Sequence, residues 1–148
     1  KEKVHLAKPE AKVTTPITSV IKALDKFNIK KISIFTPYTK TINDSVVGYF
    51  NEKNITVNSL TYFDIDSDLD IGKVDESYLF DVLSKIDMED SDALFVSCTA
   101  LPLLSIIEKL EKKINKIVLS SNQTLIWDSL NAINYKEKID GFGKLFNS

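Results

Sequence analysis

Hydrophobic positions along the chain alternate between helical spacing and short continuous runs that are typical of buried strands. After Thr15-Pro16, a pair suited to cap a helix and to occupy its first turn, apolar residues repeat at helical spacing from Ile17 to Leu24. The segment 92–97 is apolar and short enough for a strand that is buried on both faces. The same reasoning predicts helices near 15–24, 41–51, 75–87, 102–114 and 122–134, and strands near 32–36, 55–63, 92–97 and 116–120.

This alternation of strands and helices predicts the fold class. Strand–helix–strand units form right-handed crossovers and a parallel sheet whose two faces are both covered by helices. We therefore expect a Rossmann-like α/β fold, a three-layer sandwich with a four-stranded parallel sheet. Residues 1–13 are interpreted as a polar lead-in from a longer protein, and residues 14–148 as a single α/β domain.

Polar residues follow each of the four expected strands. They occupy positions 36–38 (Thr-Pro-Tyr), 64–70, 97–99 (Ser-Cys-Thr) and 120–123 (Ser-Ser-Asn-Gln). Open parallel sheets bind ligands outside the carboxyl ends of their strands. We therefore expect a functional site at this edge.

Cys98 is the only cysteine in the sequence, and it follows a buried strand. It would stand just before a helix that begins near Pro102, with Thr99 as a candidate cap, so backbone N–H groups and the helix dipole would favour a thiolate. Free cysteines are also often inert core residues, which leaves both interpretations open. Tyr38 would present a phenol at the tip of the first strand, although a surface tyrosine in a turn is the simpler interpretation of this triplet on its own.

The sequence does not fit a calcium loop or a site that depends on histidine. The alternating aspartates of 64–70 resemble a calcium loop, but an EF-hand that starts at Asp64 would need glycine and glutamate where the chain has Leu69 and Asp75. The single histidine, His5, lies in the lead-in, so serine or cysteine triads have no base and zinc sites lack ligands. A solvated loop is the better interpretation of the aspartates.

Charge and composition limit the classes of partner that we expect the chain to bind. The 19 basic residues are all lysine and alternate with acidic residues, for a net charge of -2, which argues against nucleic-acid binding. Without arginine, a bound anion must rely on backbone N–H groups and hydroxyls. No apolar run approaches the ~20 residues of a membrane span, and one cysteine cannot form an internal disulfide. We therefore expect a cytoplasmic protein without a membrane partner.

Four motifs occur in a fixed order: 14–18 (Thr-Thr-Pro-Ile-Thr), 36–38, 97–101 (Ser-Cys-Thr-Ala-Leu), and 120–123 followed by Trp127. Together they resemble the second half of a maleate cis-trans isomerase. That group is similar to arylmalonate decarboxylases and belongs with the aspartate/glutamate racemase superfamily. The resemblance extends over about 13–146 and includes 141–145 as a closing segment.

The resemblance implies two similar α/β halves, an active site between them and no metal or organic cofactor. In these isomerases a first-half cysteine adds to the double bond of maleate, rotation follows, and elimination yields fumarate. Cys98 matches the second-half cysteine, which donates and accepts the proton, and Tyr38 matches a tyrosine that binds a substrate carboxylate. A substrate-binding asparagine would fall near Ser67 or Asp68, where this chain has none. The expected substrate-binding residues are Tyr38, Pro37, Ser97, Thr99, Ser67 and Asp68.

The sequence has no counterpart of the first-half cysteine. We expect a missing amino-terminal half of the same protein, although a separate partner chain or an inactive isomerase would also account for this. The favoured function is cofactor-independent conversion of maleate, or a closely related small dicarboxylate, to its trans isomer. Alternatives are a decarboxylase or racemase that uses one cysteine, and a non-catalytic small-molecule-binding domain. Apolar surface left by the missing half would favour homo-oligomers.

Overall fold

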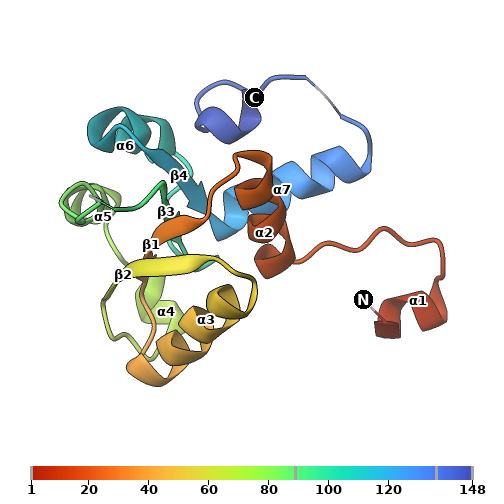
Figure 1. The fold of residues 1–148 in the computed structure, drawn as a ribbon, viewed down its shortest axis with the longest axis horizontal. Coiled ribbons are helices and arrows are strands. Elements are labelled where there is room, and N and C mark those ends of the chain that lie inside the picture. Colours follow the sequence, from red (N-terminus) through yellow and green to blue (C-terminus); the bar gives the residue numbers. More distant parts are fainter. Residues whose placement is uncertain (1, 89, 136, 148) are drawn as a thin grey trace.

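A four-stranded parallel sheet forms the centre of the molecule, with strand order β2-β1-β3-β4 (Figure 1). The structure is a computed structural model that describes residues 2–88, 90–135 and 137–147. Its strands are β1 (Lys31–Thr36), β2 (Thr56–Tyr62), β3 (Ala93–Val96) and β4 (Ile117–Ser120). All adjacent pairs run parallel, so the predicted α/β fold class is confirmed.

Helices cover both faces of the sheet (Figure 1). On one face, α2 (Pro16–Lys26), α3 (Lys40–Glu52) and α7 (Ser121–Ala132) pack against a core that includes Ile34 and Phe95. On the other face, α4 (Asp68–Ile71), α5 (Glu76–Leu83) and α6 (Ile107–Ile114) pack against Phe35 and Leu94. These neighbouring strand residues alternate between the two cores, as the pleat of a strand requires. Among the described residues, no helix has both the length and the apolar character of a membrane span.

The start of α2 follows the sequence prediction. Thr15 is its N-cap, and the Thr15 side chain accepts a hydrogen bond from Thr18 N while Thr18 Oγ1 accepts one from Thr15 N at 3.1 Å. Further along α2, Lys22 Nζ forms an ion pair with the buried Asp128 Oδ1 of α7 at 2.6 Å. The ion pair ties α2 to α7, which lie side by side.

The segment after β3 differs from the prediction. A helix was expected to begin near Pro102, but α6 begins only at Ile107, and its N-cap, Ile106, makes no side-chain capping bond. Thr99 is therefore not a cap. Pro102 disfavours helical geometry in the residue before it. Leu101 and Leu103 are both buried, and two residues at this spacing lie on nearly opposite sides of a helix, so an irregular loop is needed to bury both.

The lead-in contains a short helix that the sequence analysis did not predict. α1 (Glu2–Ala7) buries no residue, and an extended segment separates it from α2 (Figure 1). The origin of the lead-in in a preceding half of the protein stays a prediction. The predicted helix 75–87 is also shorter in the structure, where α5 ends at Leu83.

The closing segment is anchored to α6 and α7. The single-turn 3-10 helix η1 (Lys144–Phe146) begins where Lys144 N donates to Glu111 Oε2 at 2.8 Å. Gln123 Nε2 donates to Phe142 O at 2.7 Å. Burial raises the pKa of the Glu111 carboxyl, although hydrogen bonds from Val118 N and Lys144 N act in the opposite direction. The segment therefore closes over the carboxyl-terminal strand through buried polar contacts.

Candidate active site

Tyr38 and Cys98 meet at the carboxyl edge of the two central strands. Phe35 of β1 pairs with Val96 of β3, so the residues that follow both strands leave the sheet at the same place. Ser97 N extends this pairing by donating to Phe35 O at 2.9 Å. The side chains of Cys98 and Ser97 both lie close enough to the Tyr38 hydroxyl to change its pKa. Three of the residues predicted from the sequence thus form one cluster.

The Tyr38 phenol stays protonated in this environment. Burial raises its pKa well above the usual range, and the interactions with Cys98 and Asp68 raise it further. The interaction with Ser97 acts in the opposite direction but does not offset them. A phenol that keeps its proton at neutral pH can donate a hydrogen bond to an anionic group.

Cys98 lies largely inside the core. The residue is 6 % exposed and belongs to the same buried cluster as Leu101 and Leu103. Ala100 N donates to Cys98 Sγ at 3.3 Å. Because α6 begins much later than predicted, this loop N–H takes the place of the helix N-terminus that was expected to face the sulfur.

The turn that carries Tyr38 is held by a residue that the sequence analysis missed. Asn43 of α3 is fully buried; its Oδ1 accepts from Thr36 Oγ1 at 2.5 Å, and its Nδ2 donates to Tyr38 O at 3.0 Å. Pro37, predicted to bind substrate, is buried within this turn. A polar residue on the apolar side of an amphipathic helix was the signal that could have identified Asn43.

The residues after β4 act as a cap and a brace. Ser120 Oγ accepts from Gln123 N at 3.1 Å, and Gln123 Oε1 accepts from Ser120 N at 3.3 Å, which completes a capping box for α7. Asn122 Nδ2 donates to Thr99 O at 2.9 Å. The Thr99 residue is exposed. The loop that holds Cys98 is therefore braced by the first turn of α7.

The acidic loop after β2 lies beside the Tyr38 turn. Ile65 N donates to Pro37 O at 2.8 Å and joins the two segments. Ser67 is the N-cap of α4 but makes no side-chain capping bond. Asp68 is exposed, and its charge raises the pKa of Tyr38. Within the described ranges, no three His, Cys, Asp or Glu side chains converge as metal ligands.

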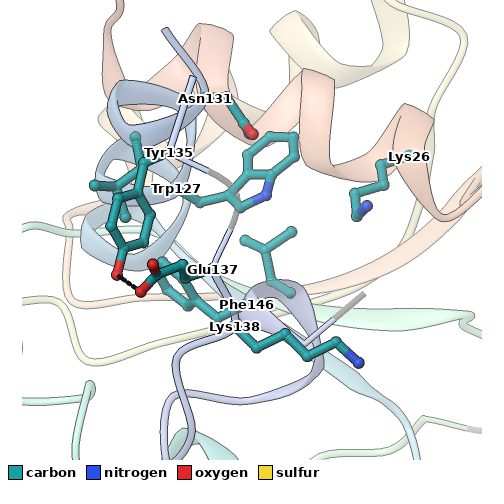
Figure 2. A pocket seen from close by; sticks show the side chains of 9 residues that line it. Lys26, Trp127, Asn131, Tyr135, Glu137, Lys138 and Phe146 are labelled. Atoms are coloured by element: carbon teal, nitrogen blue, oxygen red, sulfur yellow. Dashed lines mark hydrogen bonds between the residues drawn. The ribbon is translucent and has the colours of Figure 1, made fainter. Parts of the chain in front are cut away.

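A pocket of about 300 Å³ has a lining that includes neither Tyr38 nor Cys98. Its side chains are shown in Figure 2. It is bounded by Lys26 near the end of α2, Trp127 of α7 and Phe146 of the closing segment. On its rim, the Tyr135 hydroxyl interacts with Glu137 Oε2 at 3.1 Å. No residue predicted from the sequence as part of the site lines this pocket.

Known proteins similar to this chain include maleate isomerases and an arylmalonate decarboxylase. The chain is 25% identical over 138 residues to the maleate isomerase of Geobacillus stearothermophilus, covering 93% of this chain and 55% of the relative. It is 24% identical over 137 residues to the arylmalonate decarboxylase of Bordetella bronchiseptica, covering 90% of this chain and 57% of the relative. The chain therefore spans about half the length of these relatives.

Solved structures show the same fold. A maleate cis-trans isomerase of Nocardia farcinica, a mutant with a covalently bound succinylcysteine intermediate, matches with a TM-score of 0.91 at 18% identity, over 98% of this chain and 60% of that chain. An arylmalonate decarboxylase crystal structure matches with a TM-score of 0.81 at 25% identity, over 90% and 60% of the two chains. Residues 5–146, nearly the whole chain, match the family model described as arylmalonate decarboxylase. The protein therefore belongs to the arylmalonate decarboxylase family.

Proposed function

We propose that this chain supplies the carboxyl-terminal half of a cofactor-independent isomerase that converts maleate, or a closely related small dicarboxylate, to its trans isomer. The observation that carries the proposal is the interaction of the Tyr38 hydroxyl with the Cys98 side chain at the carboxyl edge of the sheet. Similarity to maleate isomerases over 93% of the chain supports the reaction class. Because the chain spans only 55% of that relative, the complete active site would need residues outside this sequence.

Cys98 would act as the acid and base of the reaction. A thiol held near a substrate carbon can transfer its proton to a developing carbanion, so that the S–H bond breaks and a C–H bond forms. The resulting thiolate would keep the N–H of Ala100 as a donor. Tyr38 would donate its single hydroxyl proton to a substrate carboxylate, whose oxygens gain negative charge when the carbanion forms.

The complete isomerisation would need a nucleophile from outside this chain. That nucleophile would add to one alkene carbon while the other carbon receives the proton of Cys98. The former double bond would then be single and free to rotate. Removal of a proton from that carbon by the Cys98 thiolate, after the rotation, and expulsion of the nucleophile would restore the double bond in the trans configuration.

The test uses the full-length protein that contains this segment. Proton NMR follows the conversion of maleate to fumarate by wild type, Cys98→Ala and the control Ser45→Ala, whose side chain is exposed on α3. We expect turnover by wild type and control, and a loss of roughly a thousandfold or more in Cys98→Ala with an unchanged circular dichroism spectrum. Unchanged turnover in Cys98→Ala would exclude the role proposed for this thiol. Turnover by the 148-residue chain alone would exclude the need for a second half.

A decarboxylase is the second candidate. The matching family model is described as arylmalonate decarboxylase, and the chain has one cysteine. Loss of CO₂ from a malonate leaves an enediolate, which needs one proton at carbon, and a single thiol can supply it. In D₂O, a decarboxylase would release CO₂ from an arylmalonate and place deuterium on the product carbon, whereas an isomerase would release none. A racemase would instead exchange the α-hydrogen without releasing CO₂.

A non-catalytic binding domain would behave differently from both enzymes. In an enzyme, iodoacetamide should alkylate Cys98 readily in spite of its 6 % exposure, and a bound dicarboxylate should protect it. Peptide mapping of alkylated protein, with and without maleate, measures this protection. Equal and slow alkylation under both conditions would favour the binding domain.

A further inference from the structure

A fully buried amide lies on the apolar face of α3. Asn43 has no exposed surface, and it shares this face with Val46 and the buried Phe50. Burying an amide without partners costs about 2–7 kcal/mol, depending on the reference state. The partners of Asn43 therefore indicate why it is there.

Those partners form a closed ring around the Tyr38 backbone. The Thr36 hydroxyl donates to Asn43 Oδ1 at 2.5 Å, and Asn43 Nδ2 donates to Tyr38 O at 3.0 Å. Tyr38 N donates to Thr36 Oγ1 at 3.2 Å and completes the ring. Both the N–H and the C=O of Tyr38 are thus tied to buried side chains.

Other contacts hold the residues before Tyr38. Phe63 N donates to Thr36 O at 3.2 Å, and Ile65 N donates to Pro37 O at 2.8 Å, so the neighbouring segment fixes both carbonyls. Thr39, the N-cap of α3, makes no side-chain capping bond that would hold the turn. The ring is therefore what anchors the Tyr38 backbone.

We infer that Asn43 is a positioning residue for the reaction, because it fixes where the Tyr38 phenol stands relative to the Cys98 sulfur without touching substrate itself. This role rests on the proposed function, in which the phenol binds a substrate carboxylate. It assigns a function to a polar side chain that lies on the sheet-facing side of a helix.

Three substitutions break or preserve the ring with little change of shape. Asn43→Asp keeps the oxygen that accepts from Thr36 but replaces the Nδ2 donor with an oxygen that faces Tyr38 O. Thr36→Val removes the hydroxyl, whereas Thr36→Ser retains it and should rescue the ring. Asn51→Asp makes the same chemical change at an exposed position of α3 and is the matched control.

The kinetic test is a double-mutant cycle in the full-length protein. We expect Asn43→Asp and Thr36→Val to lower kcat/KM roughly 10- to 100-fold, because small displacements of a substrate-binding group are costly. In a Tyr38→Phe background, Asn43→Asp should cost less than about threefold, since the hydroxyl that it positions is absent. Thr36→Ser and Asn51→Asp should stay near wild type. Equal losses from Asn43→Asp in the two backgrounds would overturn the inference.

A second readout does not depend on turnover. In protein labelled with ¹³C-tyrosine, the Tyr38 signal is assigned by its loss in Tyr38→Phe. In the wild type it should titrate well above the ordinary tyrosine pKa of about 10, whereas in Asn43→Asp it should shift and titrate closer to that ordinary value. If the protein converts none of the acids, the proposed function fails while this NMR test still stands. An unchanged Tyr38 signal in folded Asn43→Asp would refute the positioning role, and Thr36→Val and Thr36→Ser decide it if Asn43→Asp does not fold.

Discussion

Gly143→Ala tests how the closing segment is anchored. Gly143 has φ of 84° and ψ of 178°. An added Cβ would lie 2.7 Å from Ile107 Cγ2, 3.1 Å from Gln123 Nε2 and 3.2 Å from Glu111 Oε2. All three neighbours are buried, so they have little room to move.

The expected loss of stability in Gly143→Ala has two parts. Holding a side-chain-bearing residue in this backbone region costs about 1–3 kcal/mol. Forcing a methyl group into a packed interior costs about 1–3 kcal/mol more. The free energy of unfolding should therefore fall by roughly 2–6 kcal/mol, a large part of the total of about 5–15 kcal/mol that is typical of a folded protein.

Gly141→Ala is the matched control. Gly141 has φ of 89°, but an added Cβ would meet nothing within 4 Å. This substitution should therefore carry only the backbone cost of about 1–3 kcal/mol. The difference between the two variants isolates the steric clash with α6 and α7.

Urea unfolding followed by circular dichroism measures both values. At about 2–4 °C per kcal/mol, Gly143→Ala should also lower Tm by roughly 5–20 °C. If Gly143→Ala were no less stable than Gly141→Ala, the contacts described for the closing segment would be wrong.

Three further predictions concern the helices and the site. Asp128→Asn should destabilise the protein by about 1–2 kcal/mol at pH 7 by removing its ion pair with α2. Burial raises the pKa of Asp128, but its hydrogen bonds outweigh burial and leave the pKa below its ordinary value. The greater stability of wild type over Asp128→Asn should therefore disappear as pH falls below about 4, as urea unfolding would show. Asn122→Ala should loosen the brace on Thr99, speed iodoacetamide labelling of the site thiol roughly threefold or more and lower turnover, as peptide mapping and kinetics would show. Asp68→Asn should remove a negative charge near Tyr38 and lower KM for a dicarboxylate about two- to fivefold at low salt, with little effect at high salt.

The sequence predicted those parts of the fold that depend on local patterns. The Thr15 cap, the buried strands and the polar residues at their carboxyl ends follow from residue type and spacing, and these patterns placed Tyr38 and Cys98 at one edge. The predicted start of α6 was wrong, because the burial of both Leu101 and Leu103 is decided by tertiary packing. Asn43 was missed because its hydrogen-bond partners lie in the turn before the helix, and helical periodicity does not reveal them.

The strand order separates the site into a stable part and a part that can open. β1 and β3, which carry Tyr38 and Cys98, are interior strands with a neighbour on each side. β2 is an edge strand without a fully buried residue, and it leads into the acidic loop. Local opening of a sheet begins where fewer contacts must be broken, so the amides of β2 should exchange with solvent before those of β3. Opening on this side of the molecule should therefore start at β2, while β1 and β3 stay paired behind the phenol and the thiol.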